Sequence, residues 1–532
     1  MSEAAATLPA APQVRSSPAV NPWLIAVVVT LATFMEVLDT SIANVSLPHI
    51  AGGLSAGVDE STWIITSYLV SNAIVLPMSG WFSSLIGRKR FYMLCVALFT
   101  ASSFLCGLAP NLGALIVFRI LQGVGGGGLQ PSEQSILADT FSPSKRGMAF
   151  AMYGMAVVVA PAIGPTLGGW ITDNFSWRWI FYINLPVGLI SLILTSRLIT
   201  DPPHLQGRKR EGLKIDYIGF SLIALGLGAM QIVLDKGQRE GWFDSSFIIA
   251  LTVISAVALV TAIAWEWRHK HPVIDLTLFR DCSFAVSNAM MFMLGFVLLG
   301  STLLIPLFAQ TMLGYPATQA GEALMPGGLI IICSMPLVGF LLSRRFDPRV
   351  MMAFGLTMVS VSLFYMTRFD LSIDFWTLAT ARMLQGCGLG FLFVPINTVA
   401  YSYLPPQKNN AASGIINLSR NVGASVGISI VTTMLDRRGQ FHRNRLAAHL
   451  DPANVNVQAM LGNTSARLQA QGVSATGALQ QAYAVLQGAL QRQSEMLAYI
   501  DNFWMLGLAT LVLVPCVLLV RKPKRGGGMH AH

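Results

Sequence analysis

Charged residues are scarce in this chain. They make up 11% of its 532 residues, whereas hydrophobic residues make up 53% and the mean hydropathy is +0.59. A soluble domain of this size cannot bury so much apolar surface, so the composition excludes a soluble globular protein and indicates a polytopic membrane protein. Little room remains for a large soluble domain.

Cysteine and histidine are also sparse, and neither forms a motif. The six cysteines lie in or beside apolar segments without paired spacing, which is typical of packing residues and not of disulfides or metal ligands. The eight histidines form no cluster within an apolar segment, as a membrane-embedded enzyme with a metal or nucleophile–base site would require. The glycines at 123 and 125–128 lack the Gly-Lys-Ser/Thr ending of a phosphate loop, so they favour close helix packing. We therefore expect no metal, no cofactor and no enzymatic activity.

Apolar runs long enough to cross a bilayer core of about 30 Å recur fourteen times. This pattern predicts an all-α membrane protein whose helices lie near 22–47, 61–83, 91–110, 113–135, 147–170, 177–198, 214–234, 246–267, 283–311, 318–342, 349–367, 374–402, 410–434 and 499–521.

The distribution of Lys and Arg predicts the orientation of these helices. With a cytoplasmic amino terminus, most basic residues fall in cytoplasmic loops and tails, and the short outer loops hold only Arg178, Lys236, Arg239 and Arg368. Fourteen spans then place both termini in the cytoplasm. Since this bias accounts for most of the formal charge of +10, we expect no nucleic-acid partner.

The second half of the chain repeats the first. The segment Arg119-Ile-Leu-Gln122-Gly123 recurs as Arg382-Met-Leu-Gln385-Gly386, an offset of 263 residues (382 − 119). Two six-helix bundles with two inserted helices follow from this repeat, and parallel repeats of this kind place the substrate path at their interface. The predicted organisation is a disordered cytoplasmic tail (1–21), an amino-terminal bundle (22–198), a linker with two inserted helices (199–282), a carboxy-terminal bundle (283–521) that includes an external loop (435–498), and a cytoplasmic tail (522–532).

Four segments carry a resemblance to a known family. They are Leu38 to Pro48, Arg119 to Gly127, Gly164-Pro165-Thr-Leu-Gly168-Gly169, and Trp177 to Pro186. In this order and spacing the chain resembles the fourteen-helix drug:proton antiporters of the major facilitator superfamily, and among them the EmrB-type multidrug exporters. The resemblance implies a major facilitator fold in the inner membrane and proton-driven antiport of hydrophobic or amphipathic drugs by alternating access. It also implies that residues 435–498 dock a periplasmic membrane-fusion protein, and through it an outer-membrane channel, in a tripartite efflux pump.

Acidic residues in the first predicted helix are the main functional candidates. A carboxylate inside a membrane helix costs on the order of 2.5–3.5 kcal/mol, so Asp39 and Glu36 indicate a site for protons, ions or substrate. At about 1.5 Å per residue, Asp39 and Arg119 reach similar depths, which predicts a proton-coupling site of Asp39, Glu36 and Arg119. The alternatives are that Asp39 only bonds to Asn44 or a neighbouring helix, that Arg119 forms a structural ion pair, and that Glu36 faces a wet outer cavity.

The predicted substrate cavity draws on both halves of the chain. Methionines and phenylalanine in the ninth helix suit an adaptable apolar wall, although a packing stripe is the alternative. No carboxylate in that helix mirrors Asp39, so we expect the carboxy-terminal half to supply wall and not proton site. The candidates are Asn44, Gln122, Glu133, Met290, Phe292, Met293, Arg382 and Gln385.

Two glycine motifs complete the candidate sites. Gly164, Pro165, Gly168 and Gly169 match the family's antiporter signature, which implies close packing and a tight seal against the other half. The cytoplasmic loop motif comprises Gly80, Gly87, Arg88, Lys89 and Arg90, and Ser84 stands where the family usually has an acidic residue. That departure weakens any charge relay through Ser84.

Other functions remain open from the sequence. One is export of an endogenous metabolite, siderophore or lipid without partner proteins. A membrane-embedded lipid enzyme and a non-transporting sensor or scaffold belong to different classes, and the first of these lacks a catalytic cluster.

Overall fold

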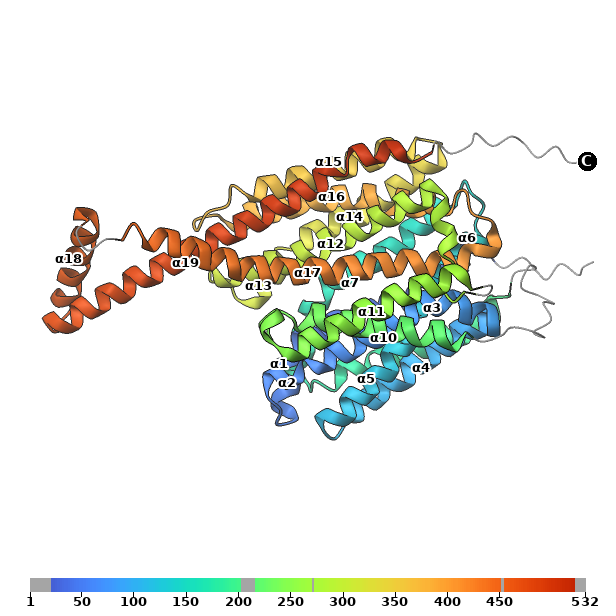
Figure 1. The fold of residues 1–532 in the computed structure, drawn as a ribbon, viewed down its shortest axis with the longest axis horizontal. Coiled ribbons are helices and arrows are strands. Elements are labelled where there is room, and N and C mark those ends of the chain that lie inside the picture. The colour runs from blue at the N-terminus through green and yellow to red at the C-terminus, as the bar shows by residue number, and fades with distance from the viewer. Residues whose placement is uncertain (1–20, 202–215, 270–271, 451–453, 522–532) are drawn as a thin grey trace, which may run out of the picture.

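The computed structural model describes residues 21–201, 216–269, 272–450 and 454–521, and these residues form helices and connecting turns without a strand (Figure 1). The basic residues predicted for the loop near 208–214, and the two predicted tails apart from Asn21, lie outside the described residues.

The first helices form one group, and two of its spans are interrupted. The bounds are α1 (Pro22–Gly53), α2 (Val58–Ser61), α3 (Trp63–Ile86), α4 (Arg88–Leu108), α5 (Leu112–Gly126), α6 (Leu129–Thr140), α7 (Arg146–Asn174), α8 (Trp179–Tyr182) and α9 (Asn184–Leu198). The glycine cluster separates α5 from α6 and lets them approach their neighbours. A Cβ atom on Gly123 would lie 2.1 Å from the Ser71 hydroxyl, and one on Gly125 would lie 2.6 Å from the backbone of Phe99.

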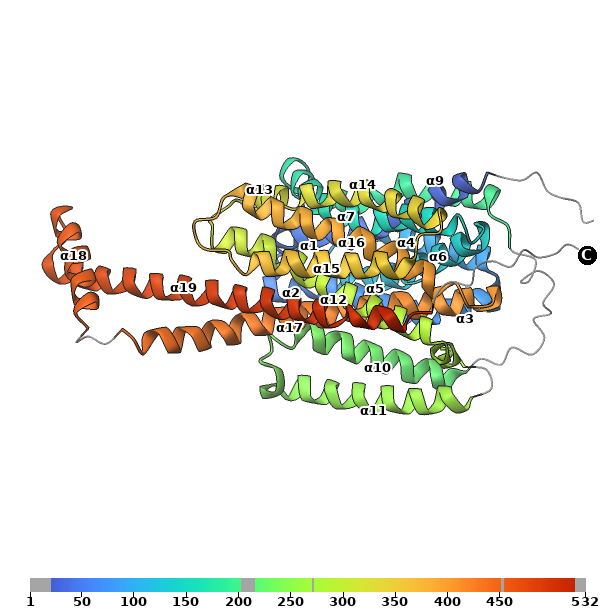
Figure 2. The same ribbon diagram turned by 90° about the horizontal axis from the view of Figure 1, so that it is seen from above.

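The next two long helices lie at the edge of the molecule. These are α10 (Tyr217–Lys236) and α11 (Ser246–Arg268), with the short turn η1 (Trp242–Asp244) between them (Figure 2). The helix α10 packs against α3 and α17, and the Gln231 amide donates to the Ser425 hydroxyl at 3.0 Å. The inserted pair thus contacts helices of both halves of the chain.

The remaining helices form the second group. The bounds are η2 (Leu276–Arg280), α12 (Cys282–Thr311), α13 (Ala317–Glu322), α14 (Met325–Ser343), α15 (Pro348–Met366), α16 (Phe375–Ala400), η3 (Pro406–Lys408), α17 (Asn409–Ala447), α18 (Val455–Ala470), α19 (Ala475–Val512) and η4 (Pro515–Leu519). Among the most extensive contacts are those of α1 with α7 and of α12 with α17. These two pairs hold equivalent positions in the sequence repeat.

Each of the fourteen predicted spans falls on a helix. Twelve helical segments in the described chain are long and apolar enough to cross a membrane, or thirteen if the two arms of α7 form one span. The arms Arg146–Pro161 and Ile163–Asn174 are bent by 44°. The helix α17 is the fourteenth, and it falls outside the apolar set because polar residues such as Asn417, Arg420 and Asn421 interrupt its apolar stretch.

The helices of the last two predicted spans extend beyond the predicted helix ends. The helix α17 continues to Ala447 instead of ending at 434, and α19 begins at Ala475 instead of 499. The described residues of the predicted external loop 435–498 are therefore mostly helical. They form the end of α17, the helix α18 and the start of α19, and this projecting hairpin extends from one end of the bundle (Figures 1 and 2). The reason is that Ala, Gln, Leu and Arg favour helices, so falling hydropathy marked the limit of the apolar span but not the end of the helix.

Candidate functional site

Asp39 lies at the centre of a buried polar cluster. Its Oδ2 atom is 2.7 Å from Nη1 of Arg119, and its Oδ1 accepts hydrogen bonds from the amides of Gln122 at 3.0 Å and Asn184 at 2.6 Å. Asp39 is 2% exposed and Arg119 is fully buried. Both carboxylate oxygens are therefore satisfied, and the pair is shielded from solvent.

Arg119 is fixed on several sides. Its Nε donates to the backbone carbonyl of Ile64 at 3.2 Å, and its guanidinium lies 4.2 Å from the centre of the Tyr68 ring. Asn44 is outside this cluster, since its exposed amide donates to the carbonyl of Thr40 in its own helix. Sequence reasoning named Asn44 and did not name Asn184 as a site residue, although Asn184 is a polar residue inside a predicted span and within the Trp177–Pro186 segment that carries the resemblance.

Glu36 occupies a second buried cluster one turn along α1. Its Oε1 accepts from the Tyr68 hydroxyl at 2.9 Å and from Asn72 at 3.3 Å, and its Oε2 accepts from Gln130 at 2.6 Å. Glu36 is 4% exposed, so the alternative of a wet outer cavity is wrong for this structure. The surrounding helices α3 and α6 exclude solvent from that face of α1.

Arg420 of α17 connects the Glu36 cluster to the other half of the chain. Its guanidinium donates to the Gln130 carbonyl oxygen and, at 3.2 Å, to the Tyr153 hydroxyl. Gln130 therefore joins Glu36 on one side to Arg420 on the other. In the sequence Arg420 is a charged residue within an apolar span, and nothing there indicates that Gln130 links it to Glu36.

Glu133 lies deeper than the sequence suggested. It is fully buried on α6, with Oε1 accepting from the Thr30 hydroxyl of α1 at 2.7 Å. Its Oε2 has no hydrogen-bond partner. Glu133 therefore lies inside the first group of helices and lines neither of the two best-defined cavities among the described residues.

The carboxy-terminal half repeats the arginine cluster without the acid. Arg382 donates to Gln385 at 2.5 Å and to the Thr302 hydroxyl at 3.0 Å, and Gln385 donates to Ser301 at 2.8 Å. Thr302 follows Asp39 by the same offset as the repeat (302 − 39 = 263). Among the described residues Arg382 has no carboxylate partner, so the two clusters differ mainly in charge.

The apolar residues predicted for the substrate cavity pack inside the second group of helices. Met290 and Met293 of α12 line a space of only about 10 Å³ whose walls come from α15, α16 and α19. The backbone of Phe292 contacts α17, where a Cβ on Gly423 would come within 2.0 Å of its carbonyl oxygen. These residues form packed core instead of a substrate-sized cavity here, because neighbouring apolar side chains fill the space.

A polar seam joins the two halves near the ends of α6 and α17. The Asn417 amide donates to Gln134 at 2.8 Å, the hydroxyls of Ser135 and Ser413 are 2.8 Å apart, and Asn409 donates to Asp139 at 2.6 Å. Further pairs across the halves are Asn410 with Ser83, Tyr153 with Asn417, and Gln134 with Asn397. Sequence reasoning missed this seam, although Asn and Gln within apolar spans were its visible signal.

The cytoplasmic loop motif is held by two acids from outside the motif. Arg88 pairs with Asp139 at 2.5 Å, and the Lys89 backbone donates to Asp201 at 2.8 Å. Gly87 has a φ of +93°, which L side chains rarely adopt, and Arg90 is exposed. A Cβ on Gly80 would lie 2.8 Å from the backbone of Ala411, so this glycine permits the contact between α3 and α17.

The antiporter-motif glycines contact a different partner from the one expected. A Cβ on Gly164 would lie 2.3 Å from the Ser41 hydroxyl, and one on Gly168 would lie 3.0 Å from Ile42, both on α1. Pro165 is half-buried, and Gly169 has no atom within 4 Å of such a Cβ. The close contacts of Gly164 and Gly168 are thus with α1, and the seal against the other half stays a prediction. Both halves do meet along α7: Gly147 and Gly154 near its start face α14 and α16, and Thr166 within the motif lies beside Gly321 of α13.

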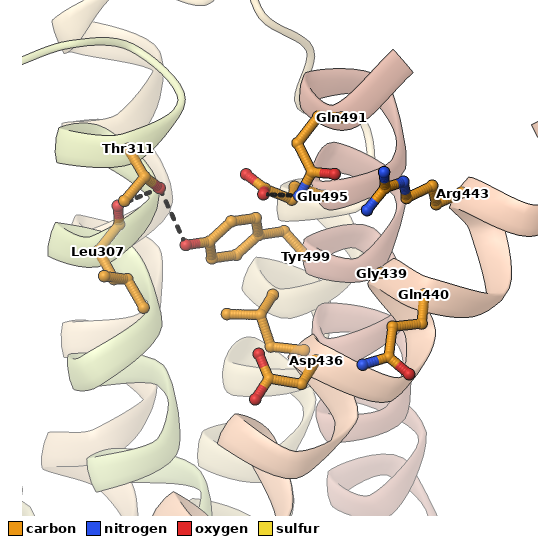
Figure 3. A pocket seen from close by; sticks show the side chains of 10 residues that line it. Leu307, Thr311, Asp436, Gly439, Gln440, Arg443, Gln491, Glu495 and Tyr499 are labelled. Atoms are coloured by element: carbon orange, nitrogen blue, oxygen red, sulfur yellow. Dashed lines mark hydrogen bonds between the residues drawn. The ribbon is translucent and has the colours of Figure 1, made fainter. Parts of the chain in front are cut away.

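A cleft of about 370 Å³ opens where the projecting hairpin meets the bundle (Figure 3). Leu307 and Thr311 of α12 form one wall, and Tyr499 of α19 donates or accepts a hydrogen bond with Thr311 at 3.1 Å. Asp436 and Arg443 of α17 line the opposite wall. In the described residues no group of three His, Cys, Asp or Glu side chains is arranged to hold a metal ion.

The chain is similar to known transport proteins over nearly its whole length. A model of the Major Facilitator Superfamily matches residues 29–435. The fatty acid resistance protein FarB of Neisseria gonorrhoeae is 38% identical, covering 94% of this chain and 96% of the relative. The multidrug export protein EmrB of Escherichia coli K12 is 36% identical, covering 96% and 98%. The colistin resistance protein EmrB of Acinetobacter baumannii is 30% identical, covering 96% and 98%.

A solved structure shares the fold at low sequence identity. The proton:xylose symporter XylE aligns with a TM-score of 0.61 and 13% identity, covering 94% of this chain and 96% of that chain. At this identity the likeness concerns the fold alone.

Proposed function

Because the chain belongs to the major facilitator superfamily, we propose that it is a proton-driven antiporter that exports hydrophobic or amphipathic drugs across the inner membrane by alternating access. Relatives named as multidrug export proteins support a multi-pass multidrug exporter and not an enzyme. The proton coupling, the access mechanism and the partners are the finer parts of the proposal.

The observation that carries the proposal is the buried Asp39–Arg119 pair. A carboxylate held at 2.7 Å from a guanidinium inside a membrane bundle is costly to build and marks a site where charge changes. When a proton binds Asp39, Arg119 loses its counter-charge, and the contacts of α1 with α5 and α9 must rearrange. Proton binding is thereby linked to helix packing.

The seam between the halves supports alternating access. Apart from the bond from Asn409 to the Asp139 carboxylate, its contacts are hydrogen bonds between neutral amides and hydroxyls, which water can replace at a net cost of only about 0.5–1.5 kcal/mol each. Where α3 and α17 meet, Gly80 and Gly414 let the two backbones approach closely, so no large side chains interlock at these positions. Such an interface suits an inner gate that opens and closes.

The absence of an acid beside Arg382 supports different roles for the two halves of the chain. Thr302 stands beside Arg382 where Asp39 stands beside Arg119, so only the first cluster can exchange a proton with its acid. We assign proton coupling to the first half of the chain, and the surrounding wall to the second.

The projecting hairpin supports docking to a periplasmic membrane-fusion protein. It carries exposed apolar side chains beyond the bundle, which on a water-facing surface mark a protein contact: Val455, Met460, Leu479, Tyr483 and Val485. Exchanging Leu479 and Tyr483, one turn apart on α19, for Gln should prevent co-purification of a fusion protein with the full chain. The variant Gln481→Ala is the matched control on the same helix. Equal recovery with all three chains would favour the alternative of an exporter that acts alone.

The transport function is tested by efflux from a host that lacks its own pumps. Cells expressing the chain should extrude an amphipathic dye such as ethidium, and an uncoupler should stop the extrusion because it collapses the proton gradient. Extrusion that persists after uncoupling would exclude a proton-driven cycle, and the absence of transport for all tested drugs would favour the metabolite, siderophore or lipid alternative.

A further inference from the structure

Three buried acidic side chains lie beside α1, two of them on that helix and the third on α6. Asp39 and Glu36 belong to α1, and Glu133 joins the same helix through its hydrogen bond with Thr30. From Thr30 to Asp39 the helix rises about 13 Å, at 1.5 Å per residue. The three carboxyl groups therefore occupy successive depths, with Glu133 nearest to the start of α1.

The three carboxyl groups differ in the donors that surround them. Asp39 faces an arginine and two amides, and Glu36 faces a tyrosine hydroxyl and two amides. Glu133 accepts a hydrogen bond from the Thr30 hydroxyl and has the Thr33 hydroxyl beside it, and its second oxygen is buried without a hydrogen bond. A carboxylate ion cannot be stabilised by so few donors in a solvent-free interior.

The titratable groups around Glu133 supply no cation. Glu36 approaches it from α1, Tyr92 from α4 and Tyr153 from α7. The Tyr92 hydroxyl is directed to the Val29 carbonyl at 3.2 Å, and Arg420 of α17 is occupied by Gln130 and Tyr153. In the described part of the chain nothing therefore neutralises a charged Glu133.

We propose that Glu133 is a second proton-binding site and the inner station of a proton path that runs along α1 from Asp39 through Glu36. In the arrangement seen here Glu133 carries a proton on its unpartnered oxygen and is neutral. This proposal rests on the proposed proton-driven function. It goes beyond the coupling group of Asp39, Glu36 and Arg119 and gives Glu133 a role other than lining a substrate cavity.

The position of Glu133 links its proton to the gate between the halves. The next two residues of α6, Gln134 and Ser135, bond across the seam to Asn417 and Ser413. When the seam opens, water reaches α6 beside Glu133 and can stabilise its charged carboxylate by hydration. The proton then leaves to the inner water, and Glu133 becomes an anion that accepts the next proton from Glu36.

Each step of the path conserves charge. A transfer from Asp39 to Glu36, or from Glu36 to Glu133, leaves the donor as a carboxylate and makes the acceptor neutral. The Tyr68 hydroxyl, which donates to Glu36, and the Thr30 hydroxyl, which donates to Glu133, can each pass on a proton while taking up another. No oxidant or cofactor is needed.

The variant Glu133→Gln tests the proposal, with the proton itself as the probe. Gln matches the shape of a neutral carboxylic acid and keeps an oxygen for Thr30, so the fold should be retained. Infrared spectra of the reconstituted full chain should show the carbonyl stretch of protonated carboxylic acids at neutral pH, and the variant should lack one component. Glu322→Gln is the matched control, because Glu322 is an exposed carboxylate outside the path.

Transport gives a second, independent reading. In vesicles with an imposed pH gradient, Glu133→Gln should slow uphill efflux of ethidium about tenfold, within the range typical of coupling between sites. Exchange of ethidium without a gradient should remain, since it needs substrate binding and gate opening but no net proton movement. Glu133→Asp, which keeps the acid, should restore part of the gradient-driven rate.

The outcomes separate this inference from the proposed function. If the parent chain is proton-coupled but Glu133→Gln keeps both the carbonyl component and the gradient-driven rate, the inner station is refuted. If the parent chain shows no dependence on the gradient, the proposed function fails, and the proton path fails with it. In that event the infrared spectrum still decides whether Glu133 holds a proton.

Discussion

Asp39→Asn removes a charge but not the shape of the side chain, and its effect follows from the donors around Asp39. Oδ2 accepts from Arg119, and Oδ1 accepts from Gln122 and Asn184. An Asn side chain has one oxygen and one NH₂ group. If its oxygen faces Arg119, its NH₂ opposes two amide donors, and if it is flipped, its NH₂ opposes the guanidinium. Neither orientation satisfies the site.

The magnitude follows from the burial of Arg119. Removing one partner of a buried ion pair costs about 3–5 kcal/mol, because the remaining charge stays desolvated without a counter-charge. Arg119 is fully buried, so solvent does not reduce this cost. We expect Asp39→Asn to lower the free energy of unfolding by an amount in this range and to abolish gradient-driven efflux.

The double variant Asp39→Asn with Arg119→Gln separates stability from coupling. With both charges removed, at least about 2 kcal/mol of the lost stability should return, since neutral replacements of buried pairs are often tolerated. Gradient-driven efflux should not return, because no acid remains at this depth. Denaturant unfolding in mixed micelles measures the first quantity, and proteoliposome efflux measures the second.

Arg382→Gln is the internal control, because it removes the equivalent arginine from a cluster without a carboxylate. It should leave the pH dependence of efflux unchanged. Full gradient-driven efflux in Asp39→Asn, or a double variant no more stable than the single one, would refute the reasoning.

Two further predictions test packing and surface charge. Gly164→Val should destabilise the protein by about 1–3 kcal/mol, because the larger side chain overpacks against Ser41. Gly169→Val places its side chain in open space and should change the stability by no more than about 0.5 kcal/mol. Thermal unfolding in detergent measures both variants, and equal effects would contradict the assigned contacts. Outside the spans, burial raises the pKa of Asp275, but the Lys408 ammonium at 2.8 Å and bonds from Thr277 outweigh it and hold the pKa below its ordinary value. The pair therefore stabilises the folded protein above the unfolded-state pKa of Asp275, and this stability is lost as the pH falls through the folded-state pKa. Lys408→Gln should lower the free energy of unfolding by about 0.5 kcal/mol at neutral pH and leave it unchanged in strong acid. A difference that does not depend on pH would contradict this assignment.

The sequence predicted those features that a single residue, an apolar run or the internal repeat is enough to indicate. Apolar run length identified the helices, because each span must satisfy its own backbone in lipid. The repeat of Arg119 at Arg382 identified equivalent positions, and helix rise alone placed Asp39 level with Arg119 before their contact at 2.7 Å was known.

The sequence failed where a signal depends on several helices at once. Gln130 is one glutamine among many until α1, α6 and α17 bring Glu36 and Arg420 to its two ends. Hydropathy also could not extend α17 and α19 beyond the apolar core, because helix propensity and membrane affinity are different properties.

The sequence by itself therefore determined the membrane-spanning architecture and the presence of buried acids in α1. Only the tertiary structure decided what each acid faces: an arginine and two amides at Asp39, neutral donors at Glu36, and threonine hydroxyls alone at Glu133. The physical reason is that the free energy of a buried charge depends on the donors within hydrogen-bonding distance, and these come from helices far apart in the chain.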